Sequence, residues 1–167
     1  MAVLTANKTR PVKPPPGGLK FRVLPLAGYT NFSGGSAENI VYKGSIVVCD
    51  ITDTPGYYHA PVLIGTIPAT AADVIGGIAM EKKSVLAANT ADGAKDVTVA
   101  VDGVWRFANA DTLTIADEGK PAYAQDDDHV NVTSTDAWWI GIVINVDADY
   151  IWVDIKPACG ALNVCPT

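Results

Sequence analysis

The chain has 167 residues, of which 49% are hydrophobic, and its formal net charge is −6 at pH 7. This length suits one domain plus a tail, and a core of that size needs no metal or disulfide to fold. The acidic balance argues against nucleic acid as a partner, because phosphate binding needs a basic face. No run reaches the ~18 apolar residues of a membrane helix, so we expect no membrane partner.

The first segment of the chain is basic and rich in proline. Residues 1–37 hold five bases and no acid, whereas residues 38–167 hold the other seven bases and all eighteen acids. Three consecutive prolines favour an extended backbone, and the Gly17-Gly18 pair makes a hinge. We therefore predict an extended N-terminal arm over residues 1–23 that binds a partner. Its expected contact residues are Lys8, Arg10, Lys13, Pro14, Pro15, Lys20 and Arg22. The alternatives are a disordered end with incidental lysines or a plain spacer.

Residues 24–157 are expected to form one domain of short strands. Runs of Val, Ile, Thr and aromatic residues alternate with Gly, Asp, Asn and Pro, which is typical of strands and turns. The clearest runs are 45–49, 75–80, 97–101, 104–107, 138–146 and 150–155. Only 69–75 and 84–91 contain enough Ala or Leu for a helical turn. The prediction is an all-β fold, a small β-barrel or β-tulip-like domain with at most one short helix. A Cys-containing tail over 158–167 follows it.

Two turns in this domain are predicted to form hairpins. Asp102-Gly103 joins two strand runs, and glycine accepts the positive φ that a two-residue hairpin needs. The segment from Val146 to Tyr150 is the second hairpin. In the strand that follows, strict alternation places Ile151, Val153 and Ile155 on one buried face.

The run from residue 138 to residue 144 is apolar on both of its faces. Such a strand lies in a core or has one face at a subunit interface. Trp138 and Trp139 are therefore candidate partner-binding residues, since tryptophan is enriched at binding hot spots. Filling the core is an equally good interpretation of both side chains.

An imperfect internal duplication is also predicted. Residues 43–50 and residues 118–126 each contain a Gly turn, a short strand and an acidic stop. Residues 74–80 are echoed by residues 139–144. Each unit would then end in a β segment, 97–107 in the first and 150–155 in the second. Two similar strand sets around one core would explain this pattern, with glycines at bulges or close backbone approaches.

Four segments of the second half resemble a family of small phage proteins. They are Val104-Trp105-Arg106-Phe107, Ala116 to Tyr123, Trp139-Ile140-Gly141-Ile142-Val143 and Tyr150 to Ile155. Their order is similar to the pattern "G-V-F … G-x-x-V/A-Y … I-G-V-A … V-x-V" of capsid decoration, or cement, proteins. Residues 44–50 and 75–80 fit its first half. The arm, an insertion over 50–68 and the Cys-containing tail depart from the pattern.

The resemblance implies a structural virion protein and not an enzyme. Members of the family sit on the outer face of a phage capsid and stabilise the shell against internal DNA pressure, often as trimers. The implied partners are the major capsid protein and other copies of this chain in a homotrimer. By analogy with lambdoid decoration proteins, the arm would contact neighbouring capsid subunits. The implied location is the virion, after synthesis in the host cytoplasm.

Few residues of the sequence could carry chemistry. Cys49 ends an apolar strand and is expected to be a buried thiol. His59 and His129 lack a spaced metal partner, and no nucleophile or phosphate-binding motif is present. We therefore expect no catalytic residue, no metal and no cofactor. Asp126-Asp127-Asp128 could bind Ca²⁺ through its oxygens, but adjacent carboxylates rarely converge, and a solvated turn is the favoured interpretation.

Two further possibilities stay open. No apolar signal core follows the first residues, which favours cytosolic synthesis with free thiols, although Cys159 and Cys165 could close a disulfide in an oxidising setting. The alternative function is a virion fibre or adhesin-like module that binds host glycan. Its sugar platform would consist of exposed aromatic residues, namely Tyr57, Tyr58, Trp105 and Trp152.

Overall fold

The computed structural model describes residues 6–28, 39–49, 56–59, 74–86, 91–109, 112–133 and 138–155. Within these ranges the fold is all-β, as the sequence predicts. They contain one turn of 3-10 helix, η1 (Ile115–Asp117), and no helix with the length and apolar character to cross a membrane. The helical turn expected over 84–91 is wrong at its start, because Lys83–Val85 form a strand.

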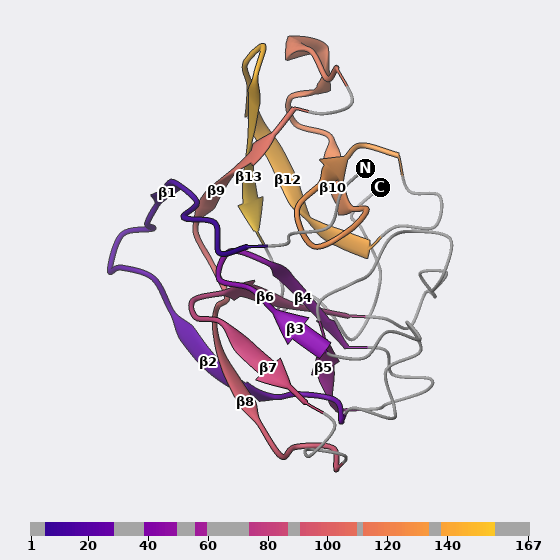
Figure 1. Ribbon diagram of the computed structural model, residues 1–167. Helices are drawn as coiled ribbons and strands as arrows, with labels where there is room; N and C mark the ends of the chain where they lie inside the picture. The colour runs from indigo at the N-terminus through magenta and orange to yellow at the C-terminus, as the bar shows by residue number, and fades with distance from the viewer. Residues whose placement is uncertain are drawn as a thin grey trace.

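The described strands form one six-stranded, one five-stranded and one two-stranded sheet, and neighbouring strands are antiparallel. The strands are β1 (Val12–Lys13), β2 (Phe21–Pro25), β3 (Asn39–Val41), β4 (Ile46–Cys49), β5 (Tyr58–His59), β6 (Val74–Ala79), β7 (Lys83–Val85), β8 (Asp96–Ala100), β9 (Val104–Ala108), β10 (Pro121–Ala124), β11 (Val130–Asn131), β12 (Trp138–Val146) and β13 (Tyr150–Ile155). The sheet orders are β1-β9-β13-β12-β10-β11, β2-β8-β6-β4-β5 and β3-β7. The six-stranded sheet lies at the top of Figure 1 and the five-stranded sheet lies below it. The described strands do not close into the barrel that the sequence suggested.

The turn at Asp102-Gly103 lies between a strand of the five-stranded sheet and a strand of the six-stranded sheet. The predicted hairpin is wrong at this position, because β8 pairs with β2 and β6, whereas β9 pairs with β1 and β13. Gly103 has a positive φ of 99°, as a hairpin glycine would, but the Asp102 carboxylate accepts a hydrogen bond from the Lys20 N–H at 2.8 Å. The turn therefore carries the chain from one sheet to the other.

The second predicted hairpin is confirmed. β12 and β13 pair through Val146 and Ile151, and the Asp147 N–H donates to the Tyr150 carbonyl at 2.7 Å. The alternation in β13 is confirmed as well, since Ile151, Val153 and Ile155 are all buried.

Each of the two larger sheets contains a set of five strands, and the two sets have the same order along the chain and the same order in the sheet. We call β2, β4, β5, β6 and β8 the first repeat, and β9, β10, β11, β12 and β13 the second repeat. Their sheet orders, β2-β8-β6-β4-β5 and β9-β13-β12-β10-β11, correspond strand by strand. The predicted duplication is therefore confirmed, with one correction. The boundary lies at Asp102-Gly103, so Val104–Ala108 begins the second repeat and does not end the first.

The register of the central strand pair is also the same in the two repeats, including a one-residue bulge. The matching pairs are Val47↔Gly77 and Val48↔Ile75 in the first repeat, and Ala122↔Gly141 and Tyr123↔Trp139 in the second. Hydrogen bonds beyond the strands repeat too: Gly44 N–H donates to Ala79 O at 2.8 Å, and Gly119 N–H donates to Val143 O at 2.8 Å. Equivalent residues therefore occupy equivalent places in the central strand pair and in the glycine turn before it.

The hydrophobic core lies in two layers. The larger cluster joins the two large sheets, with Ile46 and Ile78 from the first repeat and Phe107 and Ile140 from the second. The smaller cluster lies between the five-stranded sheet and β3–β7, and includes Val47 and Val85. β4 is thus covered on both faces, which is why it is a continuous apolar run.

Candidate functional site: the arm cluster and the β2 edge

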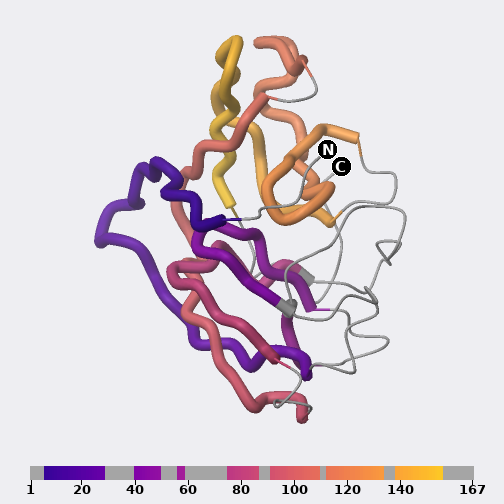
Figure 2. Tube along the Cα trace, in the orientation of Figure 1, coloured from indigo at the N-terminus to yellow at the C-terminus, as the bar shows by residue number. Residues whose placement is uncertain are grey.

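The first half of the predicted arm lies against the body of the same chain. The Lys8 N–H donates to the Lys43 carbonyl at 2.8 Å, and the Asn7 side chain accepts from the Lys43 N–H at 3.1 Å. β1 then pairs antiparallel with β9. Figure 2 shows this indigo segment passing from the upper sheet to the lower one, where it becomes β2. Residues 7–13 are therefore part of the folded unit.

Arg10 is the centre of this contact. Its side chain is buried, with the residue only 5% exposed. Its Nε donates to the Gly44 carbonyl at 2.6 Å, and its guanidinium lies 4.4 Å from the centre of the Phe107 ring. Its Nη2 forms an ion pair with the Asp128 carboxylate. Arg10 thus contacts the glycine turn of the first repeat and two elements of the second.

Asp128 receives two cations of the arm. The Lys8 Nζ lies 2.9 Å from both carboxylate oxygens, and Arg10 contacts one of them. Burial raises the pKa of Asp128, but the attraction of Arg10 and Lys8 outweighs it and holds the pKa below its ordinary value of 3.8. Burial in turn lowers the pKa of Arg10, and the neighbouring aspartates oppose that shift. Asp128 and Arg10 therefore form a buried, charged pair at neutral pH.

The acidic loop is buried, so the solvated turn expected at Asp126-Asp127-Asp128 is wrong: the three residues are 0%, 1% and 8% exposed. Asp126 Oδ1 accepts from the N–H groups of Asp128 and His129 at 2.7 Å each, and Asp127 accepts from the Ser45 hydroxyl at 2.9 Å. Each carboxylate is hydrogen-bonded inside the chain, which makes burial tolerable. We call Lys8, Arg10, Ser45 and Asp126 to His129 the arm cluster.

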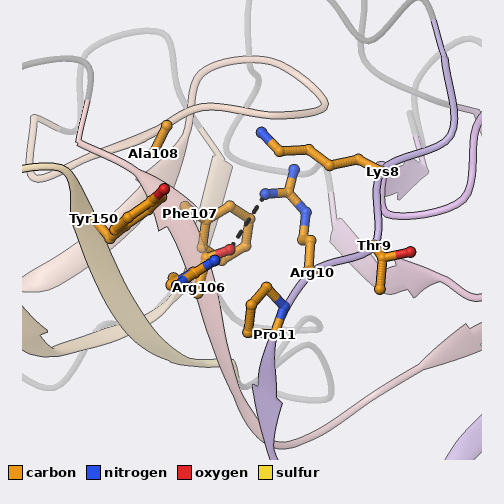
Figure 3. Close-up of a pocket in the computed structure, with 8 residues that line it drawn as sticks. All are labelled: Lys8, Thr9, Arg10, Pro11, Arg106, Phe107, Ala108 and Tyr150. Carbon is orange, nitrogen blue, oxygen red and sulfur yellow. Dashed lines mark hydrogen bonds between the residues drawn. The ribbon is translucent and has the colours of Figure 1, made fainter.

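A pocket of about 140 Å³ lies beside the arm cluster, between the arm and β9. Figure 3 shows the Arg10 guanidinium above Phe107, with Lys8 next to it. Arg10 Nη1 donates to the Arg106 carbonyl at 3.4 Å, and the Arg106 guanidinium lies 4.0 Å from the centre of the Tyr150 ring. The lining residues are Lys8, Thr9, Arg10, Pro11, Arg106, Phe107, Ala108 and Tyr150. They offer cationic donors and aromatic faces, and none of them is a carboxylate, histidine or cysteine.

The other predicted arm residues lie on the surface. Lys13 is exposed, and its Nζ lies 4.4 Å from the centre of the Trp152 ring. Pro14 is exposed and Pro15 is partly buried, and Pro15 begins a turn closed by a hydrogen bond from Gly18 N–H to Pro15 O at 3.0 Å. Lys20 and Arg22 are also exposed. Among the predicted arm residues, Arg10 is therefore buried, Lys8 and Pro15 are partly buried, and the others are exposed.

The predicted aromatic sites are mostly covered. Trp138 lies in the core and Trp139 is partly buried. Trp105 was expected in an exposed sugar platform, and this is wrong, because its ring is buried and its Nε1 donates to the Asp102 carbonyl at 2.8 Å. Tyr57, Tyr58 and Trp152 are partly buried.

The residues considered for chemistry are not brought together in the described part of the chain. Cys49 is buried, as predicted, and the His129 Nδ1 lies 2.7 Å from an Asp126 oxygen. The side chain of His59, and Cys159 and Cys165 with their possible disulfide, lie outside the described residues. Across the described ranges, no group of three or more His, Cys, Asp or Glu residues could hold a metal ion.

The exposed edge of β2 was missed by the sequence analysis, which assigned its first residues to the arm. Phe21 and Val23 are 55% and 66% exposed, and Arg22 between them is exposed as well. Among the described strands, β2 is the last of its sheet and pairs with β8, while just beyond its end Leu26 forms a single bridge with Tyr58 of β5. The run Phe21-Arg22-Val23-Leu24 could have indicated this strand, since it combines aromatic and β-branched residues directly before a proline.

The described structure thus offers two features for function, a buried arm cluster and an exposed apolar and basic edge. No protein-family model, no curated protein and no solved structure matches the chain.

Proposed function

We propose that this chain is a structural virion protein that binds the outer surface of a phage capsid and stabilises the shell. The observation that carries the proposal is the exposed pair Phe21 and Val23, flanked by the exposed cations Lys20 and Arg22. Large apolar side chains beside positive charge are typical of a surface that buries itself against an acidic partner. The resemblance of the sequence to capsid decoration proteins suggests that this partner is the capsid shell.

The arm contributes to this function in two ways. Residues 7–13 hold the arm to the body through Arg10 and β1. Residues 14–23 carry the exposed prolines, cations and apolar side chains, and these residues would contact neighbouring capsid subunits. Gly17 and Gly18 have positive φ values of 98° and 85° with open space around both. The loop around these glycines can therefore change its conformation without disturbing the arm cluster, while Phe21–Val23 stay paired with β8.

Shell stabilisation follows from mass action. A protein that binds the assembled shell, and not its separate subunits, shifts the equilibrium toward assembly. Many copies on one capsid turn a modest free energy per site into a large total. In a homotrimer, linked sites would add avidity.

The test is co-sedimentation with emptied or expanded capsids that lack decoration. The wild-type chain should sediment with these capsids and raise their melting temperature. A double variant, Phe21→Ser with Val23→Ser, should lose most of the bound protein, because it removes the apolar contact. The matched control is Ile115→Ser, since Ile115 is 77% exposed but lies on η1 in the second repeat, and this variant should bind like the wild type.

Two outcomes would contradict the proposal. In the first, the wild-type chain stays in the supernatant at every capsid concentration. In the second, it binds a glycan array or whole cells and leaves capsids unchanged, which would favour the fibre or adhesin function instead.

A further inference from the structure

The outer edge of the second repeat is already filled by the chain itself. β9 is the last strand of this repeat, and β1 pairs with its outer side. The Arg106 N–H donates to the Pro11 carbonyl of the arm at 3.1 Å. An extended segment therefore completes this sheet edge by main-chain hydrogen bonding, which is the geometry of strand addition.

The outer edge of the first repeat is β2, the equivalent of β9. Hydrogen bonds outside the strand fix which residues face the neighbour: Val101 N–H donates to Lys20 O at 3.0 Å, and Leu26 N–H donates to Lys95 O at 2.8 Å. In an antiparallel pair such bonds fall on alternate residues. Phe21 and Val23 therefore direct their N–H and C=O groups away from β8, toward the free edge.

Val23 corresponds to Arg106 in the repeat. Val23 pairs with Thr98 of β8, and Arg106 pairs with Trp152 of β13. The N–H of Arg106 has an acceptor in the arm, whereas among the described residues no strand pairs with the outer side of β2 at Val23, since β5 bridges only Leu26 beyond the end of the strand. The repeat thus shows which kind of segment fits the open edge, namely a short extended strand that runs antiparallel to it.

The charges around β2 indicate which kind of segment could pair with its open edge. Lys20 and Arg22 are exposed on this edge. Pairing of β2 with β2 of a second copy would bring these cations close to each other, and like charges opposite one another destabilise a sheet. The basic arm of a second copy would meet the same repulsion. A segment with acidic side chains would form ion pairs at the same positions.

We infer that β2 is a strand-addition site for an extended, acidic segment of a partner protein. The inference deepens the proposed function and rests on it, because the partner would be an exposed acidic strand of the shell protein. The added strand would accept a hydrogen bond from Val23 N–H and donate one to Phe21 or Val23 C=O. It would also cover the Phe21 and Val23 side chains.

The test uses a synthetic peptide of alternating glutamate and valine, with a lysine and valine peptide of the same length as its control. In an NMR titration, the acidic peptide should shift the Phe21 and Val23 amide signals and slow exchange of the Val23 amide. The basic peptide should do neither. Val23→Pro should weaken binding about tenfold, because it removes the outward donor. The strand already ends in a proline at position 25, so the substitution is compatible with this edge.

Charge is tested separately. Arg22→Glu should weaken binding of the acidic peptide about tenfold at low salt. Lys120→Glu should leave binding unchanged, because Lys120 is an exposed cation of the second repeat. If Val23→Pro fails to fold, the amide shifts of the wild-type chain in the two peptide titrations are sufficient to test the inference.

The inference fails if the acidic peptide leaves the Val23 amide unchanged, or if both peptides bind alike. Its failure can be distinguished from failure of the proposed function. Equal binding of the wild type and Val23→Pro to capsids would overturn strand addition and leave capsid binding intact. If the acidic peptide bound at β2 but the protein did not bind capsids, the strand-addition site would stand and the proposed capsid function would be overturned.

Discussion

Arg10 places a positive charge where the two repeats meet, and its side chain has no access to solvent. A buried guanidinium is tolerated only when its charge and its donors are matched. Gly44 supplies a carbonyl, Phe107 supplies a ring face, and Asp128 supplies the countercharge. The role of Arg10 is therefore structural, although the sequence suggested a partner contact.

Replacing Asp128 should expose how much this pair matters. Asp128→Ala leaves the Arg10 charge buried without its partner, which typically costs about 3–5 kcal/mol. Urea unfolding followed by circular dichroism measures the change. Asp149→Ala is the control, because Asp149 is an exposed acid in the β12–β13 turn, and it should alter stability by less than about 0.5 kcal/mol. Equal effects of the two substitutions would contradict a buried ion pair.

The lowered pKa of Asp128 predicts how stability depends on pH. Its folded pKa lies below the ordinary value of 3.8, so its contribution is complete above that value and is lost as pH falls through the folded pKa. The wild type should therefore be more stable than Asp128→Asn at neutral pH, and this difference in unfolding free energy should disappear only in strong acid. Unfolding free energies of both proteins should differ by a constant amount at neutral pH and converge below pH ~4. A gap that closes near pH 6 would assign the effect to another group.

At the scale of elements, Gly77 and Gly141 define the repeat. A Cβ at Gly77 would clash with the Ala100 carbonyl oxygen, and one at Gly141 would clash with the Asp154 carbonyl oxygen. Gly77→Ala and Gly141→Ala should each destabilise the chain by about 1–3 kcal/mol, because the backbone of the next strand must move. Thermal unfolding measures both changes. Ile144→Thr, on the exposed side of β12, should cost much less. If either alanine substitution left the stability unchanged, the close approach of that glycine to the next strand would be contradicted.

Strand periodicity and the duplication could be predicted from the sequence because both are local patterns. Alternation identified the buried face of β13, and the glycine-containing runs identified the equivalent strands β6 and β12. The Asp102-Gly103 turn was misassigned for a physical reason. Its glycine has the positive φ of a hairpin, but sheet partners are chosen by long-range packing, which no dipeptide encodes.

The arm cluster could not be predicted from the sequence. Arg10 and Asp128 are 118 residues apart, and nothing in either local sequence indicates the other. Three adjacent aspartates are usually solvated, so their burial became visible only with Ser45, Lys8 and Arg10 placed around them. The open β2 edge was missed for a different reason. The basic charge of residues 1–37 favoured an arm that runs to residue 23, and this arm included the first residues of β2.

At the scale of the whole molecule, the arm joins two similar halves. Removing residues 1–13 deletes Arg10 and β1 and leaves the buried aspartates without their cations. We expect a lower melting temperature and a broader transition, because the repeats would no longer unfold together. Differential scanning calorimetry measures both. Replacing Pro14, Pro15 and Pro16 by serine is the control, and it should leave the transition unchanged. An unaltered transition after deletion would mean that the arm adds no stability.

The central claim is that the arm completes one sheet edge and leaves the equivalent edge open for a partner. Amide hydrogen exchange of the isolated protein, measured residue by residue, tests it most directly. The Arg106 amide should exchange slowly, because the Pro11 carbonyl accepts from it, whereas the equivalent Val23 amide should exchange at nearly the rate of an unstructured peptide. Comparable protection of the two amides, or rapid exchange at Arg106, would contradict the account.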